Sequence, residues 1–352
     1  MKRKSVEEML SASKPSDIFT MNADTIEHEK DEYIEWFKPK EYNQIKNFMV
    51  TQKVILLYRQ ALVELEEDSE KENRKYFFTI HSKDGKKCEV QAYDVYDIKI
   101  GKMYVTQNNI VFIISEKNKK FYENYIEKTR KFPKLKQEVW ESIECMLPNV
   151  KRHFEDVDGN GVIVVAKPLK NIYPLREILN YFGGKIEPEY VASIITRLYN
   201  FVCYMEIIGI NHNGITIDNL FFAPGRTVEE GEKYTIEDMR IVGVYGGWFF
   251  STRTDEKLKG MPKEVYDVLP KECKTSGFSS FKVDELSIKK VSCELLGDAT
   301  GENLDNVPEP LMRWIKSSDI HENAYEEFCA WEKARENSFG KHRFVEMDVS
   351  IE

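Results

Sequence analysis

Residues 209–222 read Gly-Ile-Asn-His-Asn-Gly-Ile-Thr-Ile-Asp-Asn-Leu-Phe-Phe, a polar loop that runs into large apolar side chains. Residues 175–208, before the loop, are predicted to form two helices separated by Gly183-Gly184. The second helix, 188–208, is apolar enough that we expect it at the centre of the fold. Residues 162–166 predict a buried strand. The order around the loop is therefore strand, connector, helix, buried helix and polar loop.

The loop and the elements before it resemble the part of protein kinases that runs from the hinge to the catalytic loop. The kinase pattern there is H-R-D-x-K-x-x-N, and His212 and Asn219 stand at its first and last positions with the same spacing. Downstream, Asp284 stands where kinases carry a buried Asp that holds the backbone of the catalytic loop. The resemblance covers roughly residues 95–340. It implies an α+β fold of two lobes, a small β-rich lobe and a mostly helical large lobe.

The same region lacks the side chains that kinases use for chemistry. Gly214 stands at the position of the catalytic Asp, and glycine has no group to accept a proton from a substrate hydroxyl. Thr216 replaces the lysine of the loop. The metal-binding Asp-Phe-Gly is expected after the next strand, and Tyr245, Gly246 and Gly247 offer no carboxylate there. Because Mg²⁺ prefers anionic oxygen ligands, we expect no bound metal and no cofactor.

The motifs of the small lobe also lack residues that kinases use to bind ATP. The glycine-rich loop is represented by Gly101 alone, and the strand 110–114, which in kinases carries the ATP-pairing lysine, is apolar to its end. Lys117 lies just beyond that strand. Since four separate motifs are incomplete, the sequence favours a kinase-like fold that transfers no phosphate. In such a protein His212 and Asp284 would serve only to order the backbone.

The remaining patterns predict the other elements. Runs of β-forming residues stand at 76–81, 88–93, 103–106 and 239–242, and helical patterns stand at 121–129, 136–146, 284–296 and from 308 onward. Asp84-Gly85 predicts a hairpin after the first strand. The block Trp248-Phe249-Phe250 has two interpretations, core packing or an aromatic patch that binds a partner.

Residues 1–70 are predicted to form a charged helical hairpin that is interrupted at Lys38-Pro39-Lys40. The hairpin resembles a J-domain, the module that activates Hsp70 chaperones and carries His-Pro-Asp between two antiparallel helices. Only Pro39 of that motif is retained. The helix before it has five carboxylates and one lysine, whereas the family docks a basic helix on an acidic chaperone surface. The resemblance therefore implies a degenerate J-like fold that does not stimulate an Hsp70. An unrelated helical hairpin is the alternative.

The hairpin, the kinase-like region and the blocks 293–298 and 339–344 together resemble bacteriophage-encoded proteins described as J-domain-containing or as molecular chaperones. This resemblance implies the cytoplasm of the host cell. The expected organisation is a J-like segment at 1–70, a kinase-like small lobe at 75–166 and a kinase-like helical large lobe at 167–352.

The composition disfavours several classes of protein. The 352 residues include 51 Lys and Arg against 60 Asp and Glu, and the formal net charge of −9 disfavours general nucleic-acid binding. No apolar run reaches the roughly 18 residues that span a bilayer, and the N-terminus lacks the apolar region of a signal peptide. None of the six cysteines is arranged as C-x-x-C. We therefore expect free thiols and a cytoplasmic protein.

These patterns predict a non-catalytic pseudokinase scaffold that acts through other proteins, either a host chaperone or a phage protein, and not at a membrane. One alternative is an Hsp70 co-chaperone that acts through the J-like hairpin. Another is an atypical nucleotide-binding phosphotransferase that uses Lys117, Asn219 and a carboxylate such as Asp218 or Asp238. Nucleic-acid binding through the eight Lys and Arg between 117 and 136 is a weaker possibility, because such a run is typical of a solvated face.

Overall fold

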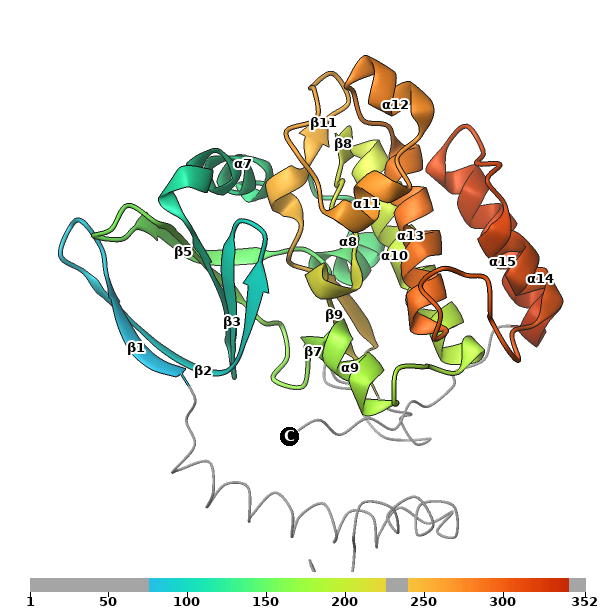
Figure 1. Ribbon diagram of the computed structural model, residues 1–352, viewed down its shortest axis with the longest axis horizontal. Helices are drawn as coiled ribbons and strands as arrows, with labels where there is room; N and C mark the ends of the chain where they lie inside the picture. The colour runs from blue at the N-terminus through green and yellow to red at the C-terminus, as the bar shows by residue number, and fades with distance from the viewer. Residues whose placement is uncertain (1–75, 226–239, 342–352) are drawn as a thin grey trace, which may run out of the picture. The chain divides into compact units, whose positions relative to one another are not determined.

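The computed structural model describes residues 76–225 and 240–341, which belong to one compact unit that begins at Tyr76 (Figure 1). The J-like hairpin with Lys38-Pro39-Lys40 lies outside the described residues, and its interpretation stays a prediction. Asp238, one of the two carboxylates considered for an atypical phosphotransferase, also lies outside the described residues.

Six antiparallel strands form one sheet in the order β1-β2-β3-β4-β6-β5. The strands are β1 (Tyr76–His81), β2 (Lys87–Ile98), β3 (Gly101–Thr106), β4 (Asn109–Ile114), β5 (Asn149–Glu155) and β6 (Gly161–Ala166). The turn between β1 and β2 contains Asp84-Gly85, as predicted, and Gly85 adopts a φ of 83°. A left-handed backbone of this kind favours glycine, which has no Cβ to collide with the chain.

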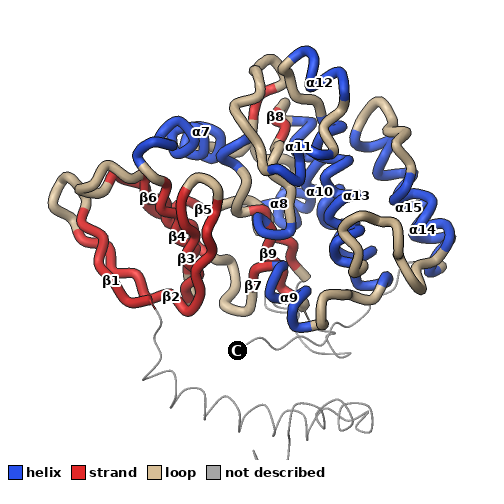
Figure 2. Tube along the Cα trace, viewed as in Figure 1, coloured by secondary structure: helices blue, strands red, loops and turns tan. Residues whose placement is uncertain are grey.

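The sheet curls until its first and last strands meet at one end (Figure 2). Ser82 forms an isolated β-bridge with Asp156, and the backbone N–H of Val157 donates to the carbonyl oxygen of His81 at 3.0 Å. The inside of the curl is filled by small β-branched and aliphatic side chains, among them Ile80, Val90, Val111, Val162 and Val164. The opposite face of the sheet packs into the larger core that it shares with the helices.

Helices account for most of the regular structure outside the sheet (Figure 1). They are α7 (Lys119–Thr129), α8 (Gln137–Glu144), α9 (Leu175–Tyr181), α10 (Pro188–Ile207), α11 (Lys263–Asp267), α12 (Lys271–Ser276), α13 (Phe281–Leu295), α14 (Glu309–Lys316) and α15 (Ala324–Phe339). Helix α10 contacts α8, α13, α15 and β10, and its apolar side chains are buried around most of its circumference. This is the central position that its composition predicts. Within the described ranges, no helix combines the length and apolar character needed to cross a membrane.

Short strands and 3₁₀ turns hold the loop 209–222 and its neighbours in place. They are β7 (Tyr173–Pro174), β8 (Ile210–Asn211), β9 (Leu220–Ala223), β10 (Ile241–Val244) and β11 (Thr252–Arg253), with η1 (Glu116–Asn118), η2 (Ile217–Asn219) and η4 (Trp248–Phe250). Strand β9 lies between β10 and β7, and β8 pairs with β11.

The α+β class, with a small sheet followed by a helical region, agrees with the sequence-based expectation. Strand β2 extends to Ile98, five residues past the expected range 88–93, and two further strands differ. Strand β5 was not predicted, because Asn-Val-Lys-Arg-His-Phe-Glu is a polar edge strand with no apolar alternation to reveal it. The strand expected at 239–242 is β10, two residues later, since Gly243 and Val244 continue its pairing with β9.

A buried polar cluster lies between α10, α13 and α15. Lys289 and His321 both contact the carboxylate of Glu327, at 3.4 and 2.6 Å. Neither carboxyl oxygen of Glu285, which is fully buried nearby, has a hydrogen-bond partner within the described residues. Burial raises the pKa of Glu285 well above its usual value, and the charges of Glu327 and Asp284 act in the same direction. Burial and these two charges therefore favour the protonated form of Glu285.

We predict that Glu285→Gln stabilises the protein increasingly as the pH rises. The pKa of Glu285 is higher in the folded protein than in the unfolded chain. The contribution of this side chain to stability is therefore complete at a pH below the unfolded-state pKa. The effect is lost as the pH rises toward the folded pKa, with a slope of up to about 1.4 kcal/mol per pH unit. Urea unfolding of both proteins between pH 5 and 8 measures the difference. The exposed acid Glu322, changed to Gln, is the control, and a pH-independent difference for Glu285→Gln would contradict the protonated state.

Candidate functional site

Asp284, on the first turn of α13, holds the backbone of the loop 209–222. Its carboxylate accepts the backbone N–H of His212 at 2.7 Å and of Asn213 at 2.8 Å. The side chain of Asn213, which has a φ of 56°, donates to the carbonyl oxygen of Phe250 and to Oγ1 of Thr252. Burial raises the pKa of Asp284 to about 7, while the two N–H groups act to lower it. The loop is therefore fixed from both sides.

The side chain of His212 is an uncharged ring packed among aromatic side chains. Its ring meets those of Trp248 and Phe201 edge-on, with centroids 5.0 and 5.5 Å apart. Neither ring nitrogen has a hydrogen-bond partner among the described residues, and burial lowers the pKa of His212 to about 3. A ring that stays uncharged and inaccessible to solvent packs the loop and does not exchange protons at neutral pH.

Gly214, at the position of the kinase catalytic base, is packed against another backbone segment. A Cβ built on Gly214 would lie 2.7 Å from both Cα and the carbonyl oxygen of Gly247. A Cβ on Gly247, whose φ is 76°, would lie 2.5 Å from the carbonyl oxygen of Gly214. The two segments approach so closely that both positions require glycine. The space that an Asp side chain needs is therefore filled by backbone.

Asn219 and Thr216 close the same loop from within. The side-chain amide of Asn219 donates to the carbonyl oxygen of Gly214 at 2.9 Å, and its backbone oxygen accepts the N–H of Gly246 at 3.2 Å. Thr216 is buried, and its carbonyl oxygen accepts the N–H of Asn219. The amide of Asn219 is neutral, and none of these contacts brings an acidic side chain to it.

Tyr245 is the residue that the sequence resemblance aligns with the first position of the metal-binding motif. Its ring is fully buried, and its hydroxyl donates to the carbonyl oxygen of Cys145 at 2.7 Å. The hydroxyl of Tyr125, on α7, donates in turn to the carbonyl oxygen of Tyr245 at 2.7 Å. Burial raises the pKa of Tyr245. Tyr245 therefore acts as a neutral bridge between α7, β10 and the end of α8.

Aromatic side chains fill the space between the sheet and this motif. Phe112 of β4 faces the rings of Tyr125 and Phe249 at centroid distances of 5.8 and 5.3 Å. In active kinases the corresponding strand and helix carry a lysine and a glutamate that pair with each other. Trp248, Phe249 and Phe250 are all buried, which identifies the Trp-Phe-Phe block as core packing. Sequence periodicity could not reveal that Phe112 and Tyr125 meet, because they lie on separate elements.

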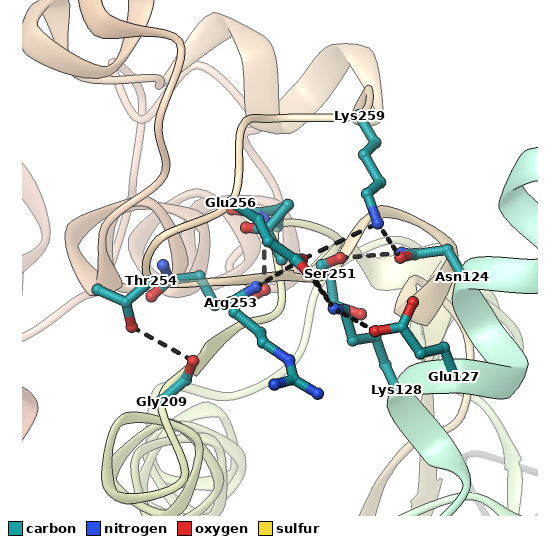
Figure 3. A network of polar contacts seen from close by, with 12 residues as sticks. Asn124, Glu127, Lys128, Gly209, Ser251, Arg253, Thr254, Glu256 and Lys259 are labelled. Atoms are coloured by element: carbon teal, nitrogen blue, oxygen red, sulfur yellow. Dashed lines mark hydrogen bonds and ion pairs between the residues drawn. The ribbon is translucent and has the colours of Figure 1, made fainter.

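Helix α7 is held to the segment that follows the Tyr245 motif by buried polar contacts (Figure 3). The side-chain amide of Asn124 donates to the carbonyl oxygens of Phe249 and Ser251. The ammonium of Lys128, which is 1% exposed, contacts both carboxylate oxygens of Glu256 at 2.8 and 2.7 Å. In kinases the position of this helix is a point of control. Here the contacts of Asn124 and Lys128, which lie about one turn apart, hold the inner face of the helix in place.

A charged cluster that the sequence did not reveal lies where β2, the residue after β6 and α9 meet. The Tyr96 hydroxyl donates to Asp94 at 2.6 Å and also contacts Glu177, and the ammonium of Lys167 lies 3.3 Å from the Tyr93 hydroxyl. Burial lowers the pKa of Lys167 to about 8 and raises that of Glu177 to about 7. Two acids and an ammonium thus converge, but they come from elements other than the loop that contains Asn219, whose amide donates within that loop.

Two of the residues proposed for an atypical phosphotransferase have other surroundings where the structure describes them. Lys117 is exposed in η1, and Asp218 forms a bidentate pair with Arg176. Gly101 begins β3, where a Cβ would lie 2.0 Å from the carbonyl oxygen of Ile113, so its glycine serves strand packing. Residues 76–225 and 240–341 contain no group of three or more His, Cys, Asp or Glu side chains positioned to share a metal ion.

Solved structures that resemble this chain are protein kinases. Vaccinia related kinase 3 matches 74% of this chain and 90% of its own, at 12% identity and a TM-score of 0.49. The kinase domain of PknI from Mycobacterium tuberculosis matches 68% and 92%, at 10% identity and a TM-score of 0.44. A further kinase domain matches 62% of this chain and 63% of its own, at 12% identity and a TM-score of 0.42. No protein-family model and no curated protein sequence matches the chain.

At these identities the matches concern the fold alone. The kinase-like character of the described part is carried by its own features: a curled sheet joined to a helical region, helix α7 after β4, and a buried Asp284 that holds the loop after α10. The matches do not bear on the J-domain, chaperone and bacteriophage resemblances, which stay predictions.

Proposed function

We propose that this chain is a pseudokinase scaffold, a kinase-like protein that transfers no phosphate and acts by binding other proteins. The observation that carries the proposal is the backbone contact between Gly214 and Gly247. In an active kinase these two segments supply the catalytic base and the metal-binding carboxylate. Here they supply neither, and their packing leaves no room for a side chain between them.

The aromatic core supports the same proposal. An ion pair between a lysine and a glutamate positions the nucleotide in active kinases, whereas Phe112 and Tyr125 occupy the facing strand and helix here. These apolar rings are stabilised by burial and would be destabilised by the entry of a charged phosphate group. The site is therefore suited to stability and not to the binding of Mg-ATP.

The contacts of α7 support a scaffold of fixed shape. Asn124 and Lys128 tie this helix to residues 249–256 through buried hydrogen bonds and an ion pair. Moving the helix would break the Lys128–Glu256 pair and leave the carbonyl groups that Asn124 contacts without this donor, which is costly. A rigid helix and loop present a constant surface to a binding partner.

A thermal-shift titration with Mg-ATP tests the proposal. A ligand at about 100 times its dissociation constant stabilises the folded state by about 2.7 kcal/mol, which raises Tm by several degrees. We expect a change smaller than about 1 °C at millimolar Mg-ATP, and no transfer of labelled phosphate. ATP without Mg²⁺ controls for non-specific anion effects. A shift of several degrees, or labelled transfer that Asn219→Ala abolishes, would favour the phosphotransferase alternative instead.

A further inference from the structure

The basic stretch between Lys117 and Lys136 is divided by the structure into two parts. In the first part, most of the cations contact other side chains of the protein. Lys119 pairs with Glu155, Lys128 is buried against Glu256, and Lys120 lies over the ring of Phe121. The second part, residues 130–136, joins α7 to α8 and reads Arg-Lys-Phe-Pro-Lys-Leu-Lys. We call residues 130–136 the basic loop.

The basic loop is anchored by its apolar residues. The ring of Phe132 packs on that of Trp248 at a centroid distance of 5.2 Å, and Leu135 packs against the main core. The hydroxyl of Tyr204 donates to the carbonyl oxygen of Pro133 at 2.9 Å. The N–H of Trp140 donates to the carbonyl oxygen of Lys136. The loop is therefore fixed by contacts at several points along its length.

All four cations of the basic loop point outward. Arg130, Lys131, Lys134 and Lys136 are exposed, and none of them forms an ion pair with another described residue, although the Lys134 ammonium lies 5.8 Å from the centre of the Trp140 ring. No acidic residue interrupts the loop. Charges are screened over roughly 8 Å at physiological salt, so the acids that matter most are those next to the loop. Within three residues of its ends along the chain these are Glu127 and Glu138, and the four cations outnumber them.

We propose that the basic loop is a docking site for a short acidic segment of a partner protein. This inference deepens the proposed scaffold function and rests on it. Seven residues span at most about 25 Å, so the loop matches an extended acidic segment of about the same length. The anchors hold the backbone of the loop in place, so little ordering of the main chain is needed on binding.

A nucleic acid fits this surface less well. Single-stranded nucleic acids bind basic grooves that also offer aromatic side chains for base stacking, but the aromatic residue of the loop, Phe132, is engaged with Trp248. A long polyanion would also extend over a molecule whose formal net charge is −9. A short acidic peptide contacts the loop alone.

The test is a fluorescence-anisotropy titration of the full chain with a labelled peptide of alternating Glu and Gly, about the length of the loop, without nucleotide. The same peptide with Gln in place of Glu, and a single-stranded DNA of equal charge, are the comparison probes. We expect the Glu peptide to bind at physiological salt and the Gln peptide not to bind. Changing Arg130, Lys131, Lys134 and Lys136 to Gln should weaken binding at least about tenfold.

The matched control changes four exposed lysines elsewhere, Lys87, Lys99, Lys170 and Lys333, to Gln, and should alter the affinity less than about twofold. Because Lys134 contacts Trp140, a triple variant that retains Lys134 guards against loss of the fold and should still weaken binding severalfold. Absence of Glu-peptide binding, an equal effect of the control, or tighter loop-dependent binding of the DNA would each overturn the proposal. None of these outcomes depends on Mg-ATP, so failure here is distinct from failure of the pseudokinase assignment.

Discussion

Restoring the missing acid by Gly214→Asp is expected to destabilise the protein by at least about 4 kcal/mol and to yield no phosphate transfer. The new Cβ would lie 2.7 Å from the backbone of Gly247, so one of the two segments must move, and overpacking of this kind costs about 1–3 kcal/mol. The carboxylate would add the cost of placing a charge at a buried position. Urea unfolding and transfer of labelled phosphate from Mg-ATP measure the two outcomes.

Two glycine variants separate these causes. Gly214→Ala introduces the steric conflict without the charge and should cost about 1–3 kcal/mol. Gly85→Ala has open space around its Cβ but a φ of 83°, so it should cost only about 1 kcal/mol for its backbone conformation. If Gly214→Asp instead folds normally and transfers phosphate, the site is a kinase centre that lacks one residue, and the scaffold proposal is wrong.

Removing the acceptor at Asp284 is expected to destabilise the protein by about 3–5 kcal/mol. The variant Asp284→Ala would leave the backbone N–H groups of His212 and Asn213 buried without partners, and each such group costs about 1–3 kcal/mol. It would also leave a small cavity. Thermal and urea unfolding give the magnitude, and amide hydrogen exchange at residues 212 and 213 should accelerate more than exchange in the curled sheet.

Two further variants serve as controls. Asp284→Asn keeps the shape of the side chain, and Asp305→Ala removes an acid elsewhere. The asparagine side chain of the first variant would retain one acceptor oxygen but turn its amide toward the second N–H, so its cost should lie between those of wild type and Asp284→Ala. Asp305 is exposed, and its replacement should change stability by less than about 0.5 kcal/mol. A cost for Asp284→Ala no larger than that of Asp305→Ala would mean that the loop does not depend on this anchor.

The elements that a local pattern could predict were those with strong periodicity. Helix α10 was recognisable from its apolar run, and the hairpin after β1 from Asp84-Gly85. Strand β5 could not be recognised because its exposed edge tolerates polar side chains in succession. The position of β10 was wrong by two residues because Gly243 weakens the β pattern, although it pairs with Phe221.

The absences at Gly214 and Tyr245 were readable from sequence, since a missing carboxylate is a property of the residue itself. The groups that occupy the place of these carboxylates could not be read from the sequence. The meeting of Phe112, Tyr125 and Phe249 and the convergence of Lys167 with Glu177 join side chains from separate elements. Their burial and altered pKa values exist only once those elements pack.

The amino-acid sequence by itself determined that positions 214 and 245–247 carry no carboxylate and where strongly periodic elements such as α10 lie, because both depend on residue identity and on neighbours within a few positions. Only the tertiary structure decided that backbone and aromatic rings fill the vacated space, that Lys128 is buried, and that the cations of residues 130–136 remain exposed. Those outcomes depend on contacts between residues far apart in the sequence, such as Lys128 with Glu256 and Phe112 with Phe249, and no local pattern encodes such distances.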